Sequence, residues 1–543
     1  MTRSRIALVG AELEENLSLR YLAAAVEQDG FDAVRVQLNH ASEGSTAVKA
    51  VLASGAKVVG LSVSFQLRAP ETLAVADELR AGGYRGHVCV GGHFATFEYE
   101  NILRHYPGVD SVARHEGEDT FRALCALVRD GKPVPALPGL VVREGSGMKV
   151  GEKRPLPALD SLPFPDRRGE PLDILGVRCA PLVGSRGCYA DCSFCCIHAY
   201  SENAEGPRYR ARSVESVVAE MAEERRTRGV RLFIFHDDNF FVPSLQKNLG
   251  RYRRMGVLMR EEGLDDVALV IKCRPNDVHP ELFSLLRSLG VIRAYVGIES
   301  SSDEGIVSLN RRVSAQDNQR ALRVLRELGV YASFNVLLFD PEATLRGIEQ
   351  NLDFLDEFTD IPFNFCRAEV YAGTPLEAML RAQGRLSGDW LAWTYAMREP
   401  RVEVLFRIVS TAFGPRNFRV DGAANLNMGI RFDVTALRHF HPSLWDPDLE
   451  ARGVALSRAV GQDSVRRLRA ALGFVRDVGL ADHSAVKAFT VSLARDIARA
   501  DLGFVGEIKA LRREVEHRLS EPGARGSGTQ LGHEGRPEPG GSP

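Results

Sequence analysis

The sequence predicts an α/β protein in which two parallel-sheet domains are followed by a mainly helical region. Three observations support this fold class: short apolar strands alternate with helical stretches over residues 1–135, the alternation returns over 174–385, and residues 386–519 have helical character. Strands that alternate with helices favour parallel sheets covered by helices. With 543 residues and 44% hydrophobic content, the chain has ample material for several packed cores.

Charge, hydropathy and cysteine content exclude several classes of protein. Lys and Arg number 69 against 71 Asp and Glu, so no basic field indicates a nucleic-acid partner. No apolar stretch approaches the roughly 18 residues that a membrane span needs, so we expect no membrane partner. Four of the nine cysteines lie within nine residues and the others are isolated, which indicates a cytoplasmic chain with one cluster of thiolate ligands rather than a disulfide framework.

Residues 1–135 are predicted to form a flavodoxin- or Rossmann-like domain. Its strands are expected at Ile6–Val9, Val34–Leu38, Val58–Val63 and His87–Val90, and its helices at Leu17–Gln28, Ser45–Ala53, Ala69–Ala81 and Thr120–Arg129. Such domains bind ligands at the carboxyl ends of their strands. Gly91 and Gly92 follow the fourth strand, where backbone without a Cβ atom can approach a ligand closely.

Residues 174–385 are predicted to form a partial (β/α)6 barrel. Residues 136–173, which are rich in proline, are interpreted as a linker with a hairpin near Leu140–Val150. Six β/α units are too few for a complete eight-stranded barrel. The barrel strands are expected at Ala180–Gly184, Leu232–Phe235, Ala268–Lys272, Ala294–Ile298, Ser333–Phe339 and Asn364–Val370.

The C-terminal region divides into a helical domain, 386–519, and a tail, 520–543. We expect the helices to close the barrel mouth and select the substrate. Trp390, Trp393 and Tyr395 are candidates to line that site, although a cluster of aromatic residues is more often core. The tail is rich in Gly, Pro, Ser and charge, and it is predicted to be disordered because it cannot bury enough apolar surface.

Cys188, Cys192 and Cys195 follow the first barrel strand with the spacing C-x3-C-x2-C. Three thiolates in one loop can hold three irons of a cubane cluster and leave the fourth iron open to a ligand. The alternative is a structural zinc site, which usually takes four ligands and has Cys196 or His198 available as the fourth. Adjacent cysteines rarely share one tetrahedral metal, so we favour the cluster and predict that Cys196 is not a ligand.

This C-x3-C-x-aromatic-C segment resembles the signature of the radical S-adenosylmethionine (SAM) superfamily. The resemblance extends over residues 177–385, through segments such as Phe235–Phe240, Lys272–Pro275, Tyr295–Ser300 and Ala372–Leu376. It implies a 4Fe–4S cluster on the three cysteines. Beyond these cluster ligands, we assign no catalytic residue. The resemblance also implies SAM bound on the open iron, against Phe194, Asp237, Asp238, Asn239, Arg274, Glu299 and Ser300.

Several of these residues have a structural role as the alternative. Asp237 and Asp238 replace the usual Gly-Gly-Glu and can instead cap the next helix. Arg274 holds a SAM carboxylate or pairs with a neighbouring acid. Glu299 suits the ribose diol, since a carboxylate accepts two hydrogen bonds, or it forms a salt bridge at the barrel rim. The fifth strand, at 335–344, departs from the usual Gly-x-Pro-Gly-Glu-Thr.

The N-terminal domain resembles the cobalamin-binding domains that precede many radical SAM cores. The segments that carry the resemblance are Asn16–Leu22, Gly60–Ser64, Gly91–Thr96 and His115–Asp119. It implies cobalamin contacts from Asn16, Leu17, Ser62, Ser64, Gly91, Gly92, His93, Thr96, Glu116 and Gly117. The Asp-x-His-x-x-Gly motif is absent, so we predict no protein histidine on cobalt, with His93 the competing candidate. The alternative is a domain of this fold that has lost cobalamin.

Together the two resemblances imply an enzyme that forms a 5′-deoxyadenosyl radical from SAM and transfers methyl from methylcobalamin to an unactivated carbon, or phosphorus. The expected partners are a small-molecule or peptide substrate in specialised metabolism and an electron donor such as flavodoxin or ferredoxin. One alternative is radical rearrangement or cyclisation without methyl transfer. Another is an iron–sulfur and cobalamin redox sensor. Methylthiolation of tRNA is disfavoured because the chain has no basic patch.

Overall fold

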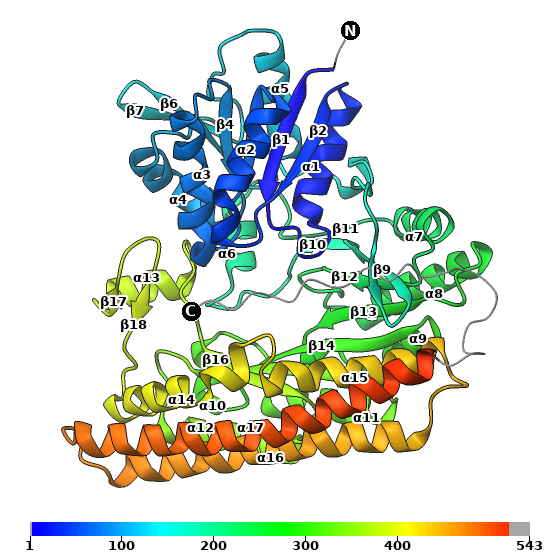
Figure 1. Ribbon diagram of the computed structural model, residues 1–543, viewed down its shortest axis with the longest axis vertical. Helices are drawn as coiled ribbons and strands as arrows, with labels where there is room; N and C mark the ends of the chain where they lie inside the picture. The colour runs from blue at the N-terminus through cyan, green and yellow to red at the C-terminus, as the bar shows by residue number, and fades with distance from the viewer. Residues whose placement is uncertain (1–2, 521–543) are drawn as a thin grey trace.

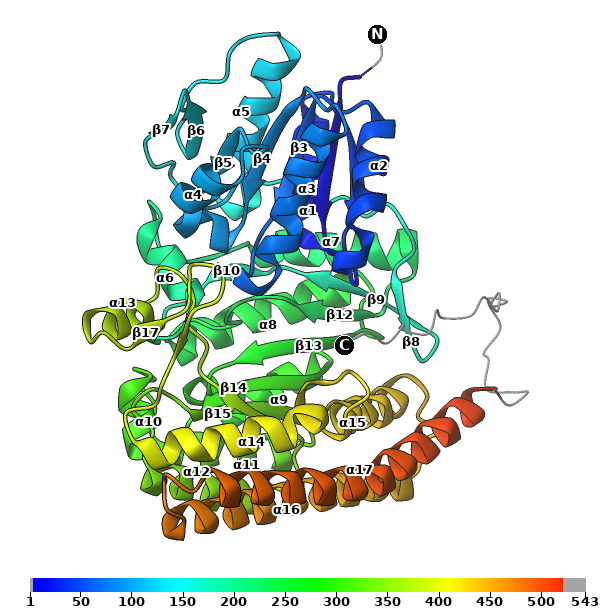
Figure 2. The same cartoon turned by 60° about the vertical axis from the view of Figure 1, so that its left-hand side comes forward.

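The computed structural model describes residues 3–520. Figure 1 shows three tiers: the N-terminal domain at the top, the second sheet in the middle and long C-terminal helices below. Figure 2 shows the same order after rotation, so the N-terminal domain and the C-terminal helices lie on opposite sides of the second sheet. No helix within residues 3–520 is both long and apolar enough to cross a membrane.

The N-terminal sheet has seven strands in the order β2-β1-β3-β4-β5-β6-β7, of which the first five are parallel. Helices α2, α3 and α4 cover one face and α1 and α5 the other. The strands are β1 Arg5–Gly10, β2 Asp32–Gln37, β3 Val58–Ser62, β4 His87–Gly91, β5 Ser111–Ala113, β6 Leu140–Glu144 and β7 Gly147–Val150. The helices are α1 Leu17–Gln28, α2 Gly44–Ser54, α3 Ala69–Ala81, α4 His93–His105 and α5 Glu118–Arg129.

The hairpin of β6 and β7 belongs to the N-terminal sheet and not to a linker. β6 pairs antiparallel with β5, with Ser111 opposite Val142 and Ala113 opposite Leu140. The hairpin covers the backbone groups that the short β5 would otherwise leave unpaired at the sheet edge. The first domain therefore extends to Val150, and the connecting segment is shorter than the 136–173 that we expected.

The second sheet is an open half-barrel with the strand order β16-β15-β14-β13-β12-β9-β8, which confirms the predicted fold class. Six strands are parallel and β8, Leu172–Ile174, adds an antiparallel edge. The parallel strands are β9 Val177–Leu182, β12 Leu232–Phe235, β13 Ala268–Cys273, β14 Val291–Glu299, β15 Tyr331–Phe339 and β16 Phe363–Arg367. The main covering helices are α7 Val214–Arg228, α8 Leu245–Glu261, α9 Pro280–Ser288, α11 Ala315–Glu327 and α12 Leu345–Glu357.

The C-terminal region is helical, and one of its helices lies at the opposite end of the barrel from the mouth that we expected the helices to close. The helices are α14 Pro400–Phe418, α15 Ala423–Phe440, α16 Pro447–Asp477 and α17 His483–Ser520. Phe432, Ala436 and Phe440 of α15 pack against side chains at the amino-terminal ends of the barrel strands, among them Val177 and Leu232. The barrel mouth lies at the carboxyl ends, so α15 plugs the floor of the barrel rather than its mouth.

The three aromatic residues after the barrel pack against protein rather than line a substrate site. The ring of Trp390 stacks on Phe94 of α4 at 5.8 Å. Tyr395 is buried and donates its hydroxyl hydrogen to the Ala368 carbonyl at 2.7 Å. Trp393 packs against the barrel core. Ser520 ends α17, and the rest of the predicted tail lies outside the described residues.

Candidate functional site

The loop that carries the cysteines is fixed by two aspartates at the end of β12. Asp237 accepts hydrogen bonds from the Gly184 amide at 2.7 Å and the Ser185 hydroxyl at 2.6 Å. Asp238 accepts one from the Gly187 amide at 2.9 Å. Burial raises the pKa of Asp237 to about 6 against the effect of these hydrogen bonds. The pair therefore positions the cysteine loop.

The structure gives Asp237 a role that the sequence did not suggest, which is to fix the cysteine loop, while its contact with SAM stays a prediction. Its two carboxylate oxygens are already used inside the protein, and the side chain is 1% exposed. It does not cap α8, because Ser244 is the residue whose side chain caps that helix. Asp238 is the member of the pair that reaches the cavity described below.

The three cysteines of the motif are free thiols at the barrel mouth. Cys192 is buried, whereas Cys188 and Cys195 are partly accessible. Cys195 immediately precedes α6, Cys196–Asn203, so Cys196 is the first residue of that helix. Within residues 3–520, no three His, Cys, Asp or Glu side chains converge as they would around a single metal ion. A cubane cluster binds each thiolate to a different iron, and three thiols on one loop fit that donor set.

Two arginines converge on the sulfur of Cys192. Arg274 Nη1 lies 3.2 Å from Cys192 Sγ, and Arg311 Nη1 lies 3.0 Å from it. Arg274 also stacks over the Tyr189 ring, with its guanidinium carbon 5.7 Å from the ring centre. Arg274 therefore contacts a thiol rather than pairing with a neighbouring acid, the alternative that we considered from sequence.

Glu299 faces the same two arginines from the end of β14. Burial raises the pKa of Glu299, while Arg311 and Arg274 act in the opposite direction. Its backbone has φ +61°, a left-handed conformation that is uncommon for a residue other than glycine and that clusters at functional sites. Glu299, Arg274 and Asp238 are the predicted SAM-binding residues with charged groups at the barrel mouth.

The other predicted SAM-binding residues are used within the protein or pack on it. Asn239 is buried and donates to Asp277 at 3.2 Å. Ser300 is fully buried, and its hydroxyl lies 3.1 Å from that of Ser302. Phe194, next to the third cysteine, packs partly buried against the barrel core.

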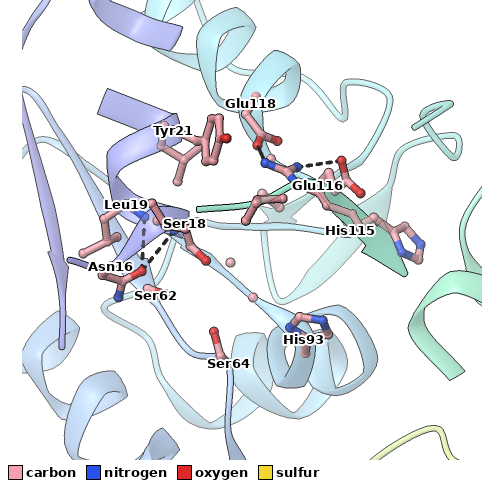
Figure 3. A pocket seen from close by; sticks show the side chains of 18 of the residues that line it. Asn16, Ser18, Leu19, Tyr21, Ser62, Ser64, His93, His115, Glu116 and Glu118 are labelled. Carbon is pink, nitrogen blue, oxygen red and sulfur yellow. Dashed lines mark hydrogen bonds and ion pairs between the residues drawn. The ribbon is translucent and has the colours of Figure 1, made fainter. Parts of the chain in front are cut away.

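A cavity of about 520 Å³ lies between the N-terminal domain and the barrel mouth (Figure 3). Loops after the N-terminal strands form one side of it, and residues of the second domain such as Arg186, Tyr200 and Arg210 form the other. Nine of the ten predicted cobalamin-binding residues line it: Asn16, Leu17, Ser62, Ser64, Gly91, Gly92, His93, Glu116 and Gly117. The wall of the cavity is therefore built from the strand ends at which the sequence predicts ligand binding.

Thr96 does not line this cavity. Its hydroxyl accepts the His115 amide hydrogen bond and lies 2.9 Å from the Gly92 carbonyl, to which it donates. Asn16 lines the cavity, but its side chain caps α1 by accepting from the Ser18 amide at 3.1 Å (Figure 3). Both residues therefore shape the loops of the cavity.

Gly92 is required by the backbone of this cavity. Its φ is +118°, and a Cβ atom there would lie 2.5 Å from the Val63 carbonyl oxygen. The loops after β3 and β4 consequently approach each other at a distance that only glycine permits. Backbone without a Cβ atom at these strand ends can approach a large cofactor closely, which fits the predicted cobalamin.

Sequence reasoning missed the contribution of the second domain to the cavity. Arg186 pairs with Glu116 at 2.7 Å and Glu118 at 2.8 Å, and Arg210 pairs with Glu116 as well. Tyr21 lies under the Arg186 guanidinium at 5.0 Å. No local sequence pattern indicates that these arginines of the second domain pair with acidic residues about 70 or more positions away along the chain.

Histidines also line the cavity. His115 has φ +62°, and its ring centre lies 5.2 Å from that of Tyr200. Burial lowers the pKa of His115 to about 4 and also lowers the pKa of His93, so both rings are neutral at pH 7. His236 of the barrel is a third lining histidine. The segment His115–Asp119 was singled out from sequence, but not His115 itself.

Buried ion pairs fix the N-terminal domain to the barrel. Arg167 of the connecting segment pairs with Glu15 of the β1–α1 loop and with Glu220 of α7 at 2.7 Å. Arg228 of α7 pairs with the same Glu15, and with Glu224 at 2.5 Å. We call this network the interdomain clamp; its members are Glu15, Arg20, Arg35, Asp166, Arg167, Arg168, Glu220, Glu224 and Arg228.

Comparison with known proteins identifies the two domains. Residues 6–125 match the B12 binding domain family, and residues 182–355 match the Radical SAM superfamily. The hopanoid C-3 methylase of Methylococcus capsulatus is 31% identical over 294 residues, which cover 52% of this chain and 53% of that protein. The chain spans about half to two thirds of the length of the curated relatives it matches first.

Two solved structures share the fold. The cobalamin-dependent S-adenosylmethionine radical enzyme OxsB, with aqua-cobalamin bound, has a TM-score of 0.68 and 15% identity and covers 95% of this chain and 80% of its own. The radical S-adenosylmethionine methyltransferase TsrM from Kitasatospora setae, with cobalamin and a [4Fe-4S] cluster bound, has a TM-score of 0.60 and 18% identity, covering 70% of this chain and 75% of its own. The arrangement of all three tiers thus recurs in OxsB.

Proposed function

We propose that this chain, a member of the cobalamin-dependent radical SAM enzymes, transfers a methyl group to an unactivated carbon, or phosphorus, of a small molecule or peptide. One observation carries the proposal: α6 joins the two sites. Cys195 precedes this helix, and Tyr200 and Ser201 near its other end line the cavity. Eight helical residues span about 12 Å, so one small substrate can meet both sites.

When bound, the cluster with SAM supplies radical chemistry and cobalamin supplies methyl-transfer chemistry. The residues of the chain hold and orient these groups. Cys188, Cys192 and Cys195 would hold the cluster, on a loop whose backbone is fixed by Asp237 and Asp238. Gly91 and Gly92, with the neighbouring strand-end loops, would hold cobalamin.

The second domain also helps to position the N-terminal loops relative to the barrel mouth. Arg186 and Arg210 reach across the cavity to Glu116 and Glu118, which sets the position of the N-terminal loops over the barrel mouth. The neutral rings of His93 and His115 offer hydrogen bonds to uncharged polar groups of a bound cofactor or substrate. We retain the prediction that neither ring binds cobalt.

Methyl transfer is favoured over rearrangement or cyclisation because relatives of this chain are named as methylases and methyltransferases. A relative of similar fold, TsrM, has a structure with tryptophan as its bound substrate, which supports a small molecule as the substrate class here. An electron donor such as flavodoxin or ferredoxin and a cytoplasmic location remain part of the proposal.

The test uses full-length protein that has been reconstituted anaerobically with iron, sulfide and cobalamin. It is incubated with a reductant, SAM carrying a deuterated methyl group and a panel of small molecules and peptides. We expect 5′-deoxyadenosine and a product that has gained the labelled methyl group. Product without label would refute methyl transfer from SAM, and absence of 5′-deoxyadenosine would refute radical formation. The Cys192→Ala protein is the inactive control.

A further inference from the structure

The two arginines at Cys192 form an unusual pair of buried cations. Arg274 is 6% exposed and Arg311 is 4% exposed, and each directs one Nη atom at the same sulfur. Their other Nη atoms bond to backbone carbonyls, Arg274 to Arg311 and Arg311 to Gly297. The two guanidinium groups are therefore held in place independently of any bound ligand.

Acidic side chains do not neutralise these cations directly. Within residues 3–520, neither Arg274 nor Arg311 has a carboxylate oxygen within 4.0 Å, and the Nε atom of each lacks a hydrogen-bond partner. Glu299 interacts with both only at longer range. Burying unpaired charge is costly, and the Cys192 thiolate with the group that it holds is the nearest source of compensating negative charge.

We propose that Arg274 and Arg311 are positioning residues that tune the reduction of the cluster held by Cys188, Cys192 and Cys195. The inference rests on the proposed function. Cluster reduction takes one electron from a low-potential reductant; no bond forms or breaks, and the cluster gains one negative charge. Two cationic donors 3.0–3.2 Å from a ligand sulfur stabilise that more negative state, because charge-assisted bonds in a buried site are strong. Hydrogen bonds to cluster sulfurs are known to set the potential.

Arg312 provides a matched control for this pair. It is the next residue after Arg311, and it pairs with Asp191, which adjoins Cys192. Its side chain is 71% exposed, so its charge is screened by solvent. Arg312→Gln removes the same formal charge as Arg311→Gln from nearly the same point of the chain, but it removes no donor to the sulfur.

The experiment is a redox titration of the reconstituted full-length protein, with the reduced cluster followed by electron paramagnetic resonance and with iron measured in each sample. In Arg311→Gln and Arg274→Gln, we expect the ratio of reduced to oxidised cluster at a fixed potential to fall about tenfold, which corresponds to about 59 mV for one electron. Iron content should stay at the wild-type level. Arg312→Gln should titrate as the wild type does.

Arg311→Lys keeps the charge and one donor, and we expect it to recover part of the shift. It also serves as the test protein if Arg311→Gln does not fold. Unchanged potentials in the Arg311 and Arg274 variants with full iron content would overturn this inference and leave the proposed function intact. An equal shift in Arg312→Gln would also overturn it, because net charge alone would then account for the effect. A wild-type protein that binds no cluster would instead overturn the proposed function.

Discussion

Replacing Glu15 by glutamine tests whether the interdomain clamp holds the two domains together. The Glu15 side chain is 4% exposed and its carboxylate contacts Arg167 and Arg228, with Arg20 3.8 Å away. Glutamine has nearly the same shape but no charge. The substitution therefore leaves three guanidinium groups without their shared anion while it preserves the packing.

The expected cost follows from this burial. Removing one partner of a buried ion pair costs about 3–5 kcal/mol when the remaining charge is left uncompensated. Arg167 and Arg228 keep Glu220 and Glu224 as partners, so we expect the lower end, about 3 kcal/mol. At about 1.4 kcal/mol per factor of ten, domain separation should become more frequent by roughly 100-fold. An exposed pair would cost about 1 kcal/mol or less.

Amide hydrogen exchange of residues 11–16 and 166–168 measures this opening directly. We expect these segments to exchange faster in Glu15→Gln by the factor given above, while the barrel core is unchanged. Glu14→Gln is the control, since Glu14 is 51% exposed and its nearest ionic contact is His236 at 3.6 Å. Exchange in Glu15→Gln within tenfold of wild type would refute the reasoning.

The clamp also predicts a direction for the effect of pH. Burial alone would raise the pKa of Glu15, but Arg167, Arg228 and Arg20 outweigh it, and the net pKa lies below its ordinary value of 4.5. A carboxylate with a depressed pKa stabilises the folded state above its unfolded pKa, and this stability is lost as the pH falls through the folded pKa. The glutamine variant should lack this part of the acid sensitivity.

Three further predictions concern the cavity and the cysteine loop. Gly92→Ala should destabilise the N-terminal domain by about 1–3 kcal/mol and lower cobalamin retention, because the new Cβ atom meets the Val63 carbonyl. Gly55→Ala is the control, since Gly55 also has a positive φ but has open space around it, and this variant should retain cobalamin. Absorbance measures the cobalamin that each variant retains. Cys192→Ala should abolish bound iron, whereas Cys196→Ala should keep it; iron analysis showing the reverse would contradict the ligand assignment. Arg186→Gln should weaken cobalamin binding in a titration by about tenfold or more, since Glu116 and Glu118 would lose a buried partner.

Strong local patterns made much of the fold predictable. The helices at Leu17–Gln28 and Ala69–Ala81 and the strand at Leu232–Phe235 have the expected bounds, because apolar periodicity and flanking polar residues agree there. β5 was missed because three residues carry no readable periodicity. α4 was missed because it is kinked at Glu98, where the backbone is not helical.

The candidate site was predictable to the extent that it is built from loops next to strands. The cysteine loop and the strand-end glycines stand out in the chain itself. Tyr200, Arg186 and Arg210 border the N-terminal loops only because two domains meet. The two arginines at Cys192 come from separate loops of the barrel itself, more than 80 residues away along the chain. The floor position of α15 likewise depends on packing between distant segments, which no local spacing records.

The interdomain clamp defines which part of the chain behaves as an exchangeable module. The backbone carbonyl of Asp166 accepts a hydrogen bond from Arg20, and that of Arg168 accepts one from Arg35. This part of the connecting segment is therefore complementary to the N-terminal domain. Arg167, which lies between them, forms an ion pair with Glu220 of α7 and is therefore complementary to the barrel. In a chimaera joined just after Val150, Arg35 of the N-terminal domain would lose Asp166, and Arg167 of the connecting segment would lose Glu15. A hybrid enzyme with a borrowed cobalamin domain would therefore need residues 166–168 transplanted with that domain, and Glu220 and Glu224 retained in the recipient barrel.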